Sequence, residues 1–204
     1  MRGLTPKLVR RALIPAGYLV FLGGLLISGV VFYRGKPFDP KAAVLSDLES
    51  PDDNPHGYGA AAAGTAICGV LLIPVAATFC MRLWRRRPLL TLAGAVWFAI
   101  GLGSSIAIGL LAPFTHGYTP LHVQLAYAAF AGICAGTLIH LVAAGAPRRL
   151  IALQSAAFLF LIYLYFAPDF FSNDRLLTSL AFWEWVLCAD CGVSLWMLAH
   201  HIDA

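Results

Sequence analysis

Six long runs of apolar residues, separated by polar segments, dominate the pattern of hydrophobic and polar positions along this chain. The runs show no strict alternation of apolar and polar residues. Each is close to the ~20 residues that a helix needs to cross the hydrocarbon core of a membrane. We expect spans at residues 12–33, 57–81, 88–112, 121–146, 150–167 and 176–199. The pattern therefore predicts an all-α, polytopic bundle of six transmembrane helices that forms a single domain.

The composition supports this prediction. The chain has 204 residues, of which 60% are hydrophobic and only 12% are charged. A soluble domain usually carries charge on about a quarter of its residues, so the outer surface of this chain is expected to face lipid. The first run is longer than the apolar core of a signal peptide, and no cleavage site follows it. We expect it to remain as the first span.

The basic residues predict the orientation of the bundle. Ten of the fourteen lysines and arginines precede the first run, or lie between runs two and three or runs four and five. Short loops that are rich in lysine and arginine stay in the cytoplasm, so both termini are expected there. Residues 34–56 then form a long non-cytoplasmic loop. The arginine-rich second loop and the small size favour the bacterial inner membrane.

Several polar residues gather on the predicted outer side. Ser46, Asp47 and His56 belong to the long loop, His116 lies in the next outer loop, and His122 opens the fourth run. Histidine is the side chain that changes charge near neutral pH, which suits a base or a head-group contact. The alternative for Ser46 and Asp47 is a local one, in which they cap a short helix or turn.

The sixth run contains two acidic residues, Glu184 and Asp190, beside Trp185. A carboxylate inside a membrane is costly, and it must face a partner or a wet cavity. The two acids are six residues apart, or about 240° around a helix, and are expected to face different neighbours.

These residues predict a pocket near the outer leaflet. Its proposed catalytic residues are His122 as a base, Glu184 as the group that orients it, and Asp47; acyl transfer or ester hydrolysis would be the reaction. No G-x-S-x-G motif supplies a nucleophile. The remaining candidates are binding residues: Ser46, His56, His116, Trp185 and Asp190.

Other classes of site have weaker support. The five cysteines lie inside the apolar runs, which is typical of small buried hydrophobes and not of a disulfide framework. No metal site is predicted, and the sequence identifies no cofactor. No groove of basic and aromatic residues suggests nucleic acid. The expected partners are membrane lipids, with other membrane subunits or a second copy of the chain as further options.

Three segments resemble a known family. The loop "PFDPKAAVLSDLESPDDNP", the fourth run "LHVQLAYAAFAGICAG" and the sixth run "FWEWVLCADCGVSLWM" are similar to the six-span proteins of the damage-regulated autophagy modulator (DRAM), Frag and Sfk-like family, or to a related bacterial family of unknown function. The resemblance implies a six-span helical protein with a role in lipid biology. The matched residues are Ser46, Asp47, His122, Glu184 and Trp185. Glu49 departs from the family pattern, which has glycine there.

Three functions follow as alternatives. The first is a lipid-related protein that binds or remodels a lipid head group in an outer-leaflet pocket. The second is a non-enzymatic accessory or scaffold subunit of a membrane complex. The third is a b-type cytochrome, because His122 and His140 are eighteen residues apart and so share one helix face.

Overall fold

The computed structural model describes residues 5–37, 39, 41, 43–114, 119–166 and 175–203. Within these residues every regular element is a helix and no strand occurs. The six long helices are α2 (Ile14–Tyr33), α4 (Tyr58–Leu83), α5 (Pro88–Leu111), α6 (Pro120–Ala144), α7 (Arg148–Phe166) and α8 (Leu180–Asp203). The short elements are α1 (Pro6–Leu8), the π-helical turn η1 (Val9–Leu13), α3 (Leu45–Glu49) and the 3₁₀ turns η2 (Ala112–Phe114) and η4 (Leu176–Thr178).

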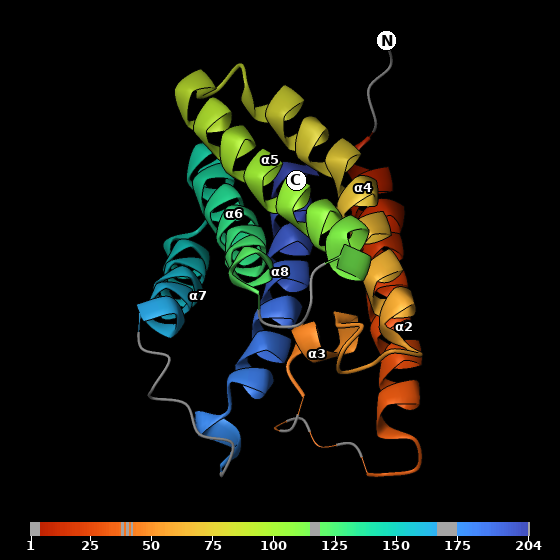
Figure 1. The fold of residues 1–204 in the computed structure, drawn as a ribbon. Coiled ribbons are helices and arrows are strands. Elements are labelled where there is room, and N and C mark those ends of the chain that lie inside the picture. The colour runs from red at the N-terminus through yellow and green to blue at the C-terminus, as the bar shows by residue number, and fades with distance from the viewer. Residues whose placement is uncertain are drawn as a thin grey trace.

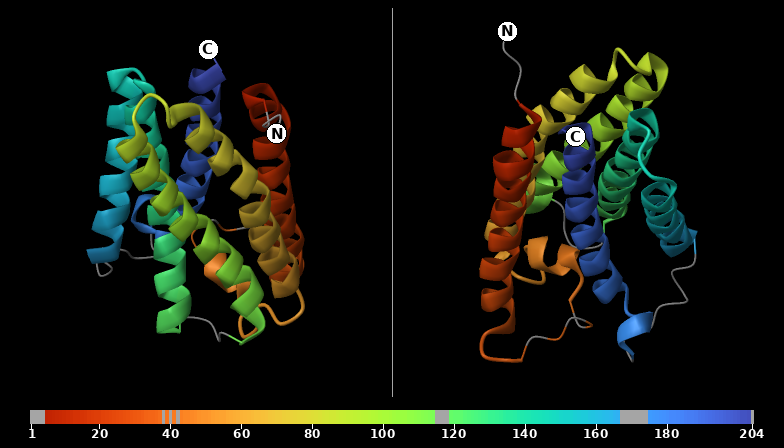
Figure 2. Two further views of the ribbon diagram at one scale, coloured as in Figure 1. Left: turned by 90° about the horizontal axis from the view of Figure 1, so that it is seen from above. Right: turned by 180° about the vertical axis from the view of Figure 1, so that it is seen from behind.

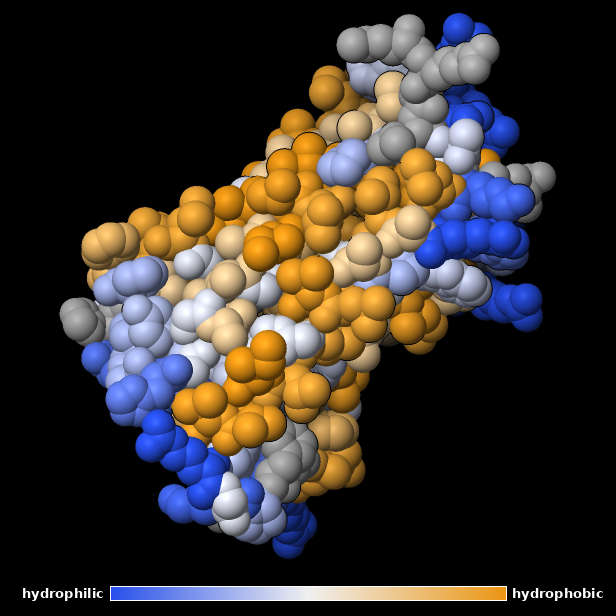
Figure 3. Space-filling view, turned by 90° about the vertical axis from the view of Figure 1, so that its right-hand side faces the viewer, coloured by the Kyte–Doolittle hydropathy of each residue, from blue (hydrophilic) through white to orange (hydrophobic). Residues whose placement is uncertain are grey.

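Six of these helices are long and apolar enough to cross a membrane. The predicted all-α, six-span bundle is therefore confirmed, and the chain is an integral membrane protein. The surface agrees, because an apolar band separates two hydrophilic ends of the molecule (Figure 3). The η1 segment and the C-terminal part of α8 lie at the same end of the bundle (Figures 1 and 2). A hydrogen bond between Arg10 and His200 joins them there.

The sixth span begins later than its hydrophobic pattern predicted. Leu176–Thr178 forms a 3₁₀ turn, and α8 starts only at Leu180. Ser179 is buried at this junction, and its hydroxyl accepts a hydrogen bond from the Phe182 amide at 3.4 Å. Glu184 is therefore four residues into its helix, a rise of about 6 Å, and lies in the first turns rather than deep in the span.

The fourth span begins with a well-defined cap. Thr119 accepts a hydrogen bond from the backbone amide of His122 at 3.4 Å, and Pro120 occupies the first helical position. Both features are favourable at a helix start. At the other end Gly145 adopts a φ of 71°, a left-handed conformation that glycine takes without strain. The cap places His122 in the first turn of α6.

The long loop after α2 folds back into the bundle. Helix α3 lies beside α2 and α8, at the end opposite the chain termini (Figure 1). Leu45 and Leu48 of α3 are buried against Leu25 of α2, Ala61 of α4 and Cys188 of α8. This burial of apolar side chains holds the short helix in place, although five residues alone would not form a stable helix.

Hydrogen bonds fix the same loop to α2. The Ser28 hydroxyl donates to the carbonyl of Leu48 at 2.7 Å. The Asn54 side-chain amide donates to the carbonyl and the hydroxyl of Ser28, at 3.1 and 2.7 Å. Ser28 and Asn54 are both buried, so these polar groups depend on each other for partners.

Close backbone contact joins α5 and α6. A Cβ atom added at Gly101 would lie 2.7 Å from the backbone nitrogen of Ile133, and one added at Gly132 would also overlap the α5 backbone. Small residues allow membrane helices to approach in this way. The Gly132-x-x-x-Gly136 pattern thus marks a real packing face, since Gly136 lies against Phe98 of α5.

Candidate functional site

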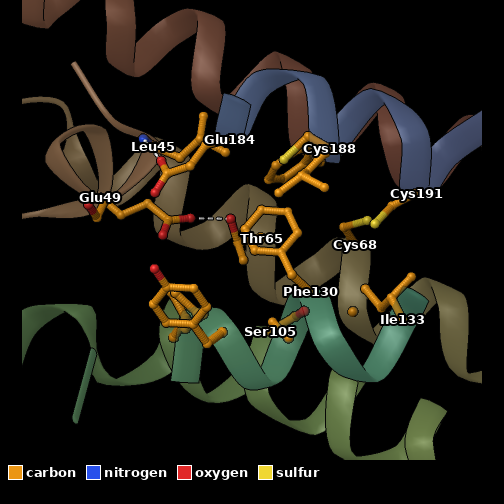
Figure 4. Close-up of a pocket in the computed structure, with 18 of the residues that line it drawn as sticks. Leu45, Glu49, Thr65, Cys68, Ser105, Phe130, Ile133, Glu184, Cys188 and Cys191 are labelled. Atoms are coloured by element: carbon orange, nitrogen blue, oxygen red, sulfur yellow. Dashed lines mark hydrogen bonds between the residues drawn. The ribbon is translucent and has the colours of Figure 1, made fainter. Parts of the chain in front are cut away.

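A cavity of about 190 Å³ lies inside the bundle, and every long helix contributes to its lining. Apolar side chains form most of the wall, including Phe21, Leu72, Leu102 and Ile133. Polar groups are concentrated at the α3 end. Figure 4 shows Glu49 and Glu184 at one end of the cavity, Cys68 and Cys191 at the other, and Cys188 between them. The cavity is therefore amphipathic along its length.

The two carboxyl groups at the α3 end come from segments far apart in the sequence. Glu49 ends α3, and its Oε1 accepts a hydrogen bond from the hydroxyl of Thr65 in α4. Glu184 lies on α8, and its Oε2 accepts a hydrogen bond from the backbone amide of Leu45 at 2.7 Å. Both bonds tie α3 to the spans. They also leave the second oxygen of each carboxyl without a hydrogen bond in the described part of the chain.

Burial strongly affects Glu49, which lies outside the membrane-spanning helices. Its side chain is 6% exposed. Removal from water raises the pKa of the Glu49 carboxyl to about 7, and the hydrogen bond from Thr65 opposes this rise. Glu49 therefore titrates near neutral pH, far above an ordinary carboxyl group.

His122 and Ser46 complete the polar end. Both line the cavity. His122 is 5% exposed, and no hydrogen bond to its imidazole ring is found among the described residues. In particular, no such bond links the ring to Glu184 or to the Ser46 hydroxyl there. The predicted pair of a base and its orienting carboxylate thus shares a cavity, but the contacts that an activated nucleophile needs are not formed in this state.

The opposite end of the cavity is lined by cysteine thiols. Cys68, Cys188 and Cys191 contribute to the wall. All five cysteines are free, and the sulfur atoms of Cys134 and Cys191 are 3.7 Å apart in a sulfur–sulfur contact. This end offers weak donors and acceptors, so it accommodates apolar groups better than charged ones.

Besides Asp190, three predicted site residues are not part of the lining of the cavity, and a fourth is not described. Asp47 accepts a hydrogen bond from the Val44 amide at 3.1 Å, which caps α3 as the local alternative predicted. Trp185 packs against the cluster that holds α3. His56 is exposed in the loop. His116 lies outside the described residues.

Asp190 also has a place away from the cavity. Its Oδ2 accepts a hydrogen bond from the Gln154 amide of α7 at 3.3 Å, and its Oδ1 accepts one from the Ser194 hydroxyl at 3.4 Å. The Ser194 hydroxyl also lies within hydrogen-bond reach of Gln154 Oε1. Gln154 and Ser194 are both buried. These groups form a polar link between α7 and α8, and the two acids of α8 do face different neighbours.

The geometry around His140 does not support a haem site. The Nδ1 of His140 lies 2.8 Å from the Gly136 carbonyl, and its Nε2 lies 3.8 Å from the Cys80 sulfur. The ring centroid is 5.1 Å from that of Phe98, and the ring abuts Gly94 of α5. Both nitrogens are thus engaged and the ring faces are packed. Among the described residues, no group of three His, Cys, Asp or Glu side chains is arranged to hold a metal ion.

Sequence reasoning missed Glu49 and Thr65. Glu49 enters the sequence analysis only as a departure from the family pattern, although the spacing of Leu45, Leu48 and Glu49 places all three on one face of a helix. The structure buries that face. This spacing was the available signal. No sequence signal identifies Thr65, because a threonine in a span rich in small residues can have several structural roles.

Comparisons with protein-family models, curated proteins and solved structures found no match for this chain, so the interpretation of the site rests on its geometry.

Proposed function

We propose that this integral membrane protein binds one end of a lipid or lipid-like amphiphile inside its bundle. The polar group lies between Glu49, Glu184 and His122, and the apolar part extends toward Cys188 and Cys191. The observation that supports this proposal is the layout of the cavity, which has its carboxyl groups at the α3 end and mostly apolar side chains and thiols elsewhere, beside the hydroxyl groups of Tyr18 and Ser105. Ligand sites commonly combine apolar walls with a few convergent polar groups.

The size of the cavity limits what enters it. An apolar cavity of about 150 Å³ holds a molecule such as benzene, and this cavity measures about 190 Å³. That is room for a small head group with a few methylene groups, or for one end of a chain. The rest of an amphiphile would extend into the surrounding lipid. A head group or a chain end is thus the part that is recognised.

The orientation that we propose puts the polar end of the cavity near the outer leaflet. Both termini are cytoplasmic, residues 34–56 are on the other side, and the membrane is the bacterial inner membrane. The distribution of lysine and arginine supports this orientation. Ten of the fourteen precede the first span, or lie between the second and third spans or between the fourth and fifth spans.

A variant that fills the cavity tests the proposal. Ala126→Phe adds a ring at a position in the cavity wall. Ala128→Phe makes the same change on α6 at a position outside the described lining. We expect native mass spectrometry of protein extracted in mild detergent to show a bound lipid or amphiphile on the wild type and on Ala128→Phe, and much less on Ala126→Phe. Equal amounts on all three proteins, or none on the wild type, would contradict the proposal.

A specific observation favours a second candidate, the scaffold. The hydrogen bond from the Leu45 amide makes Glu184 an anchor for α3, and a residue used only for that purpose would matter only for stability. Under the scaffold hypothesis, Glu184→Gln and His122→Ala lower the melting temperature and leave the bound amphiphile unchanged. Under the binding hypothesis the amount or identity of the bound amphiphile changes while the protein remains folded.

A further inference from the structure

We propose that the polar end of the cavity recognises a primary ammonium group, so that the ligand is a cationic amphiphile. This class includes long-chain amines and lipids whose head group ends in an amine. The inference rests on the proposed function, since it names the chemistry that the same cavity selects.

The charges around the cavity are the first argument. Glu49 and Glu184 both face its polar end, and the described residues that line it include no lysine or arginine. Two carboxyl groups in a mostly apolar cavity without a basic partner are unfavourable when ionised. A ligand cation would supply the missing charge. A phosphate without a cationic partner would instead add a like charge and be repelled.

The open hydrogen-bond acceptors are the second argument. One oxygen of each carboxyl accepts a hydrogen bond from the protein, from Thr65 in one case and from the Leu45 amide in the other. The other oxygen of each is without a donor among the described residues. A primary ammonium group has three N–H donors, so two of them match these two oxygens.

His122 is the third argument, and it is independent of the acids. Its ring is buried, lines the cavity and accepts or donates no hydrogen bond among the described residues. A ring nitrogen that meets the cavity without a protein partner is available to a ligand. A neutral imidazole offers one acceptor nitrogen, and in this proposal it accepts the third N–H of the ammonium group. A quaternary ammonium ion has no N–H to donate, and an alcohol has only one donor.

Equilibrium binding of radiolabelled decylamine to the detergent-purified protein tests the proposal, with decanol as the neutral analogue of equal chain length. We expect decylamine to bind at least about tenfold more tightly than decanol, because hydrogen bonds to charged groups are stronger than neutral ones. Glu184→Gln and Glu49→Gln should each reduce decylamine affinity about tenfold or more. Neither should affect decanol comparably.

Asp53→Asn is the matched control. It makes the same type of change at an exposed acid of the same loop and should leave decylamine affinity unchanged. Thr65→Val is a milder variant that keeps both carboxyl groups and should weaken decylamine binding less than either glutamine variant. Thr65→Val is also expected to disturb folding less than the glutamine variants, because it removes no carboxyl group from the cavity.

The pH dependence provides a second readout. An ammonium ion favours the ionised form of Glu49, so decylamine affinity should rise between pH 5.5 and pH 8, and Glu49→Gln should reduce that rise. The other titratable groups around the cavity are Glu184, Cys188 and Cys191 of α8, His122 and Tyr127 of α6, Cys68 of α4 and Tyr18 of α2. The amine itself stays charged, since alkylammonium groups such as that of lysine have a pKa of about 10.4.

The outcomes separate the inference from the proposed function. Equal affinity for decylamine and decanol, both lost in Ala126→Phe, would overturn the ammonium site and leave the amphiphile site standing. Binding of neither ligand, with no lipid on the purified protein, would overturn both. Competition by lipid with an ethanolamine head group, but not by lipid with a choline head group, would identify the amine of a lipid as the source; decylamine binding without such competition would identify a free amine.

Discussion

The two acidic residues of α8 lie six residues apart and have opposite surroundings. Asp190 receives hydrogen bonds from Gln154 and Ser194 and lies outside the described cavity wall. Glu184 receives one hydrogen bond from a backbone amide, and it faces the cavity together with Glu49. Asp190 is satisfied by one side chain of α7 and one of its own helix, while Glu184 keeps an acceptor available.

This difference shows how the role of an acidic residue in a membrane bundle is inferred from its surroundings. An acid that accepts a hydrogen bond from a side chain of an adjacent helix, as Asp190 does from Gln154, holds that helix in place. An acid that faces a cavity, beside a second acid and an unpartnered imidazole, is available to a ligand. Position in the sequence does not separate the two cases, because both are single acids in one apolar run. The surroundings separate them.

The largest effect is expected from the pH dependence of stability. The pKa of Glu49 rises from about 4.5 to about 7 on folding, so the folded state holds a proton that the unfolded state has lost between these values. The free energy of unfolding is therefore highest below pH 4.5, and it falls by about 3 kcal/mol as the pH rises through this range and past 7. Thermal unfolding in detergent without added ligand should show this loss, and Glu49→Gln should remove most of it. Parallel pH profiles of the two proteins would contradict the burial of Glu49.

An intermediate effect is expected at Asp190. Replacing it with leucine leaves the buried Gln154 amide without its carboxylate partner, which should lower the free energy of unfolding by about 1 to 2 kcal/mol. Amine affinity should not change. The double variant Asp190→Leu, Gln154→Leu removes both partners and should recover most of the loss, as measured by melting temperature. A loss of amine affinity in Asp190→Leu would break the distinction between the two acids.

The smallest effect on stability is expected at Glu184. In Glu184→Gln the side-chain carbonyl still accepts the hydrogen bond from the Leu45 amide, so the free energy of unfolding should fall by less than about 1 kcal/mol. The same variant should have the larger effect on amine binding. Chemical denaturation and amine binding measured on one preparation compare the two effects. A large loss of stability with unchanged binding would instead assign Glu184 to the scaffold.

The sequence was sufficient for the helical bundle, because hydrophobic run length is a direct consequence of membrane thickness. Four of the six spans start within two residues of their predicted positions, and the first starts three residues early, at Val9. The sixth starts later, because the apolar residues Leu176 and Leu177 belong to a 3₁₀ turn that hydrophobicity alone does not distinguish from a helix.

The candidate site was only partly predictable. His122, Glu184 and Ser46 were selected by type and position, and they do line one cavity. Glu49 could not be ranked above the other loop acids, because its burial depends on α3 folding back between spans that are distant in sequence. Asp47 has the same chemistry as Glu49, yet it caps α3. The spacing of Glu49 with Leu45 and Leu48 indicates that they share a helix face, but the burial of that face in the bundle is decided by tertiary packing.

The most direct test of the account is an experimental structure of the protein with decylamine bound. We predict the amine nitrogen within hydrogen-bond distance, about 2.7 to 3.2 Å, of a carboxyl oxygen of Glu49 and of Glu184, with the alkyl chain directed toward Cys188 and Cys191. An amine bound at Asp190 or only at the outer surface, with the cavity empty, would contradict it.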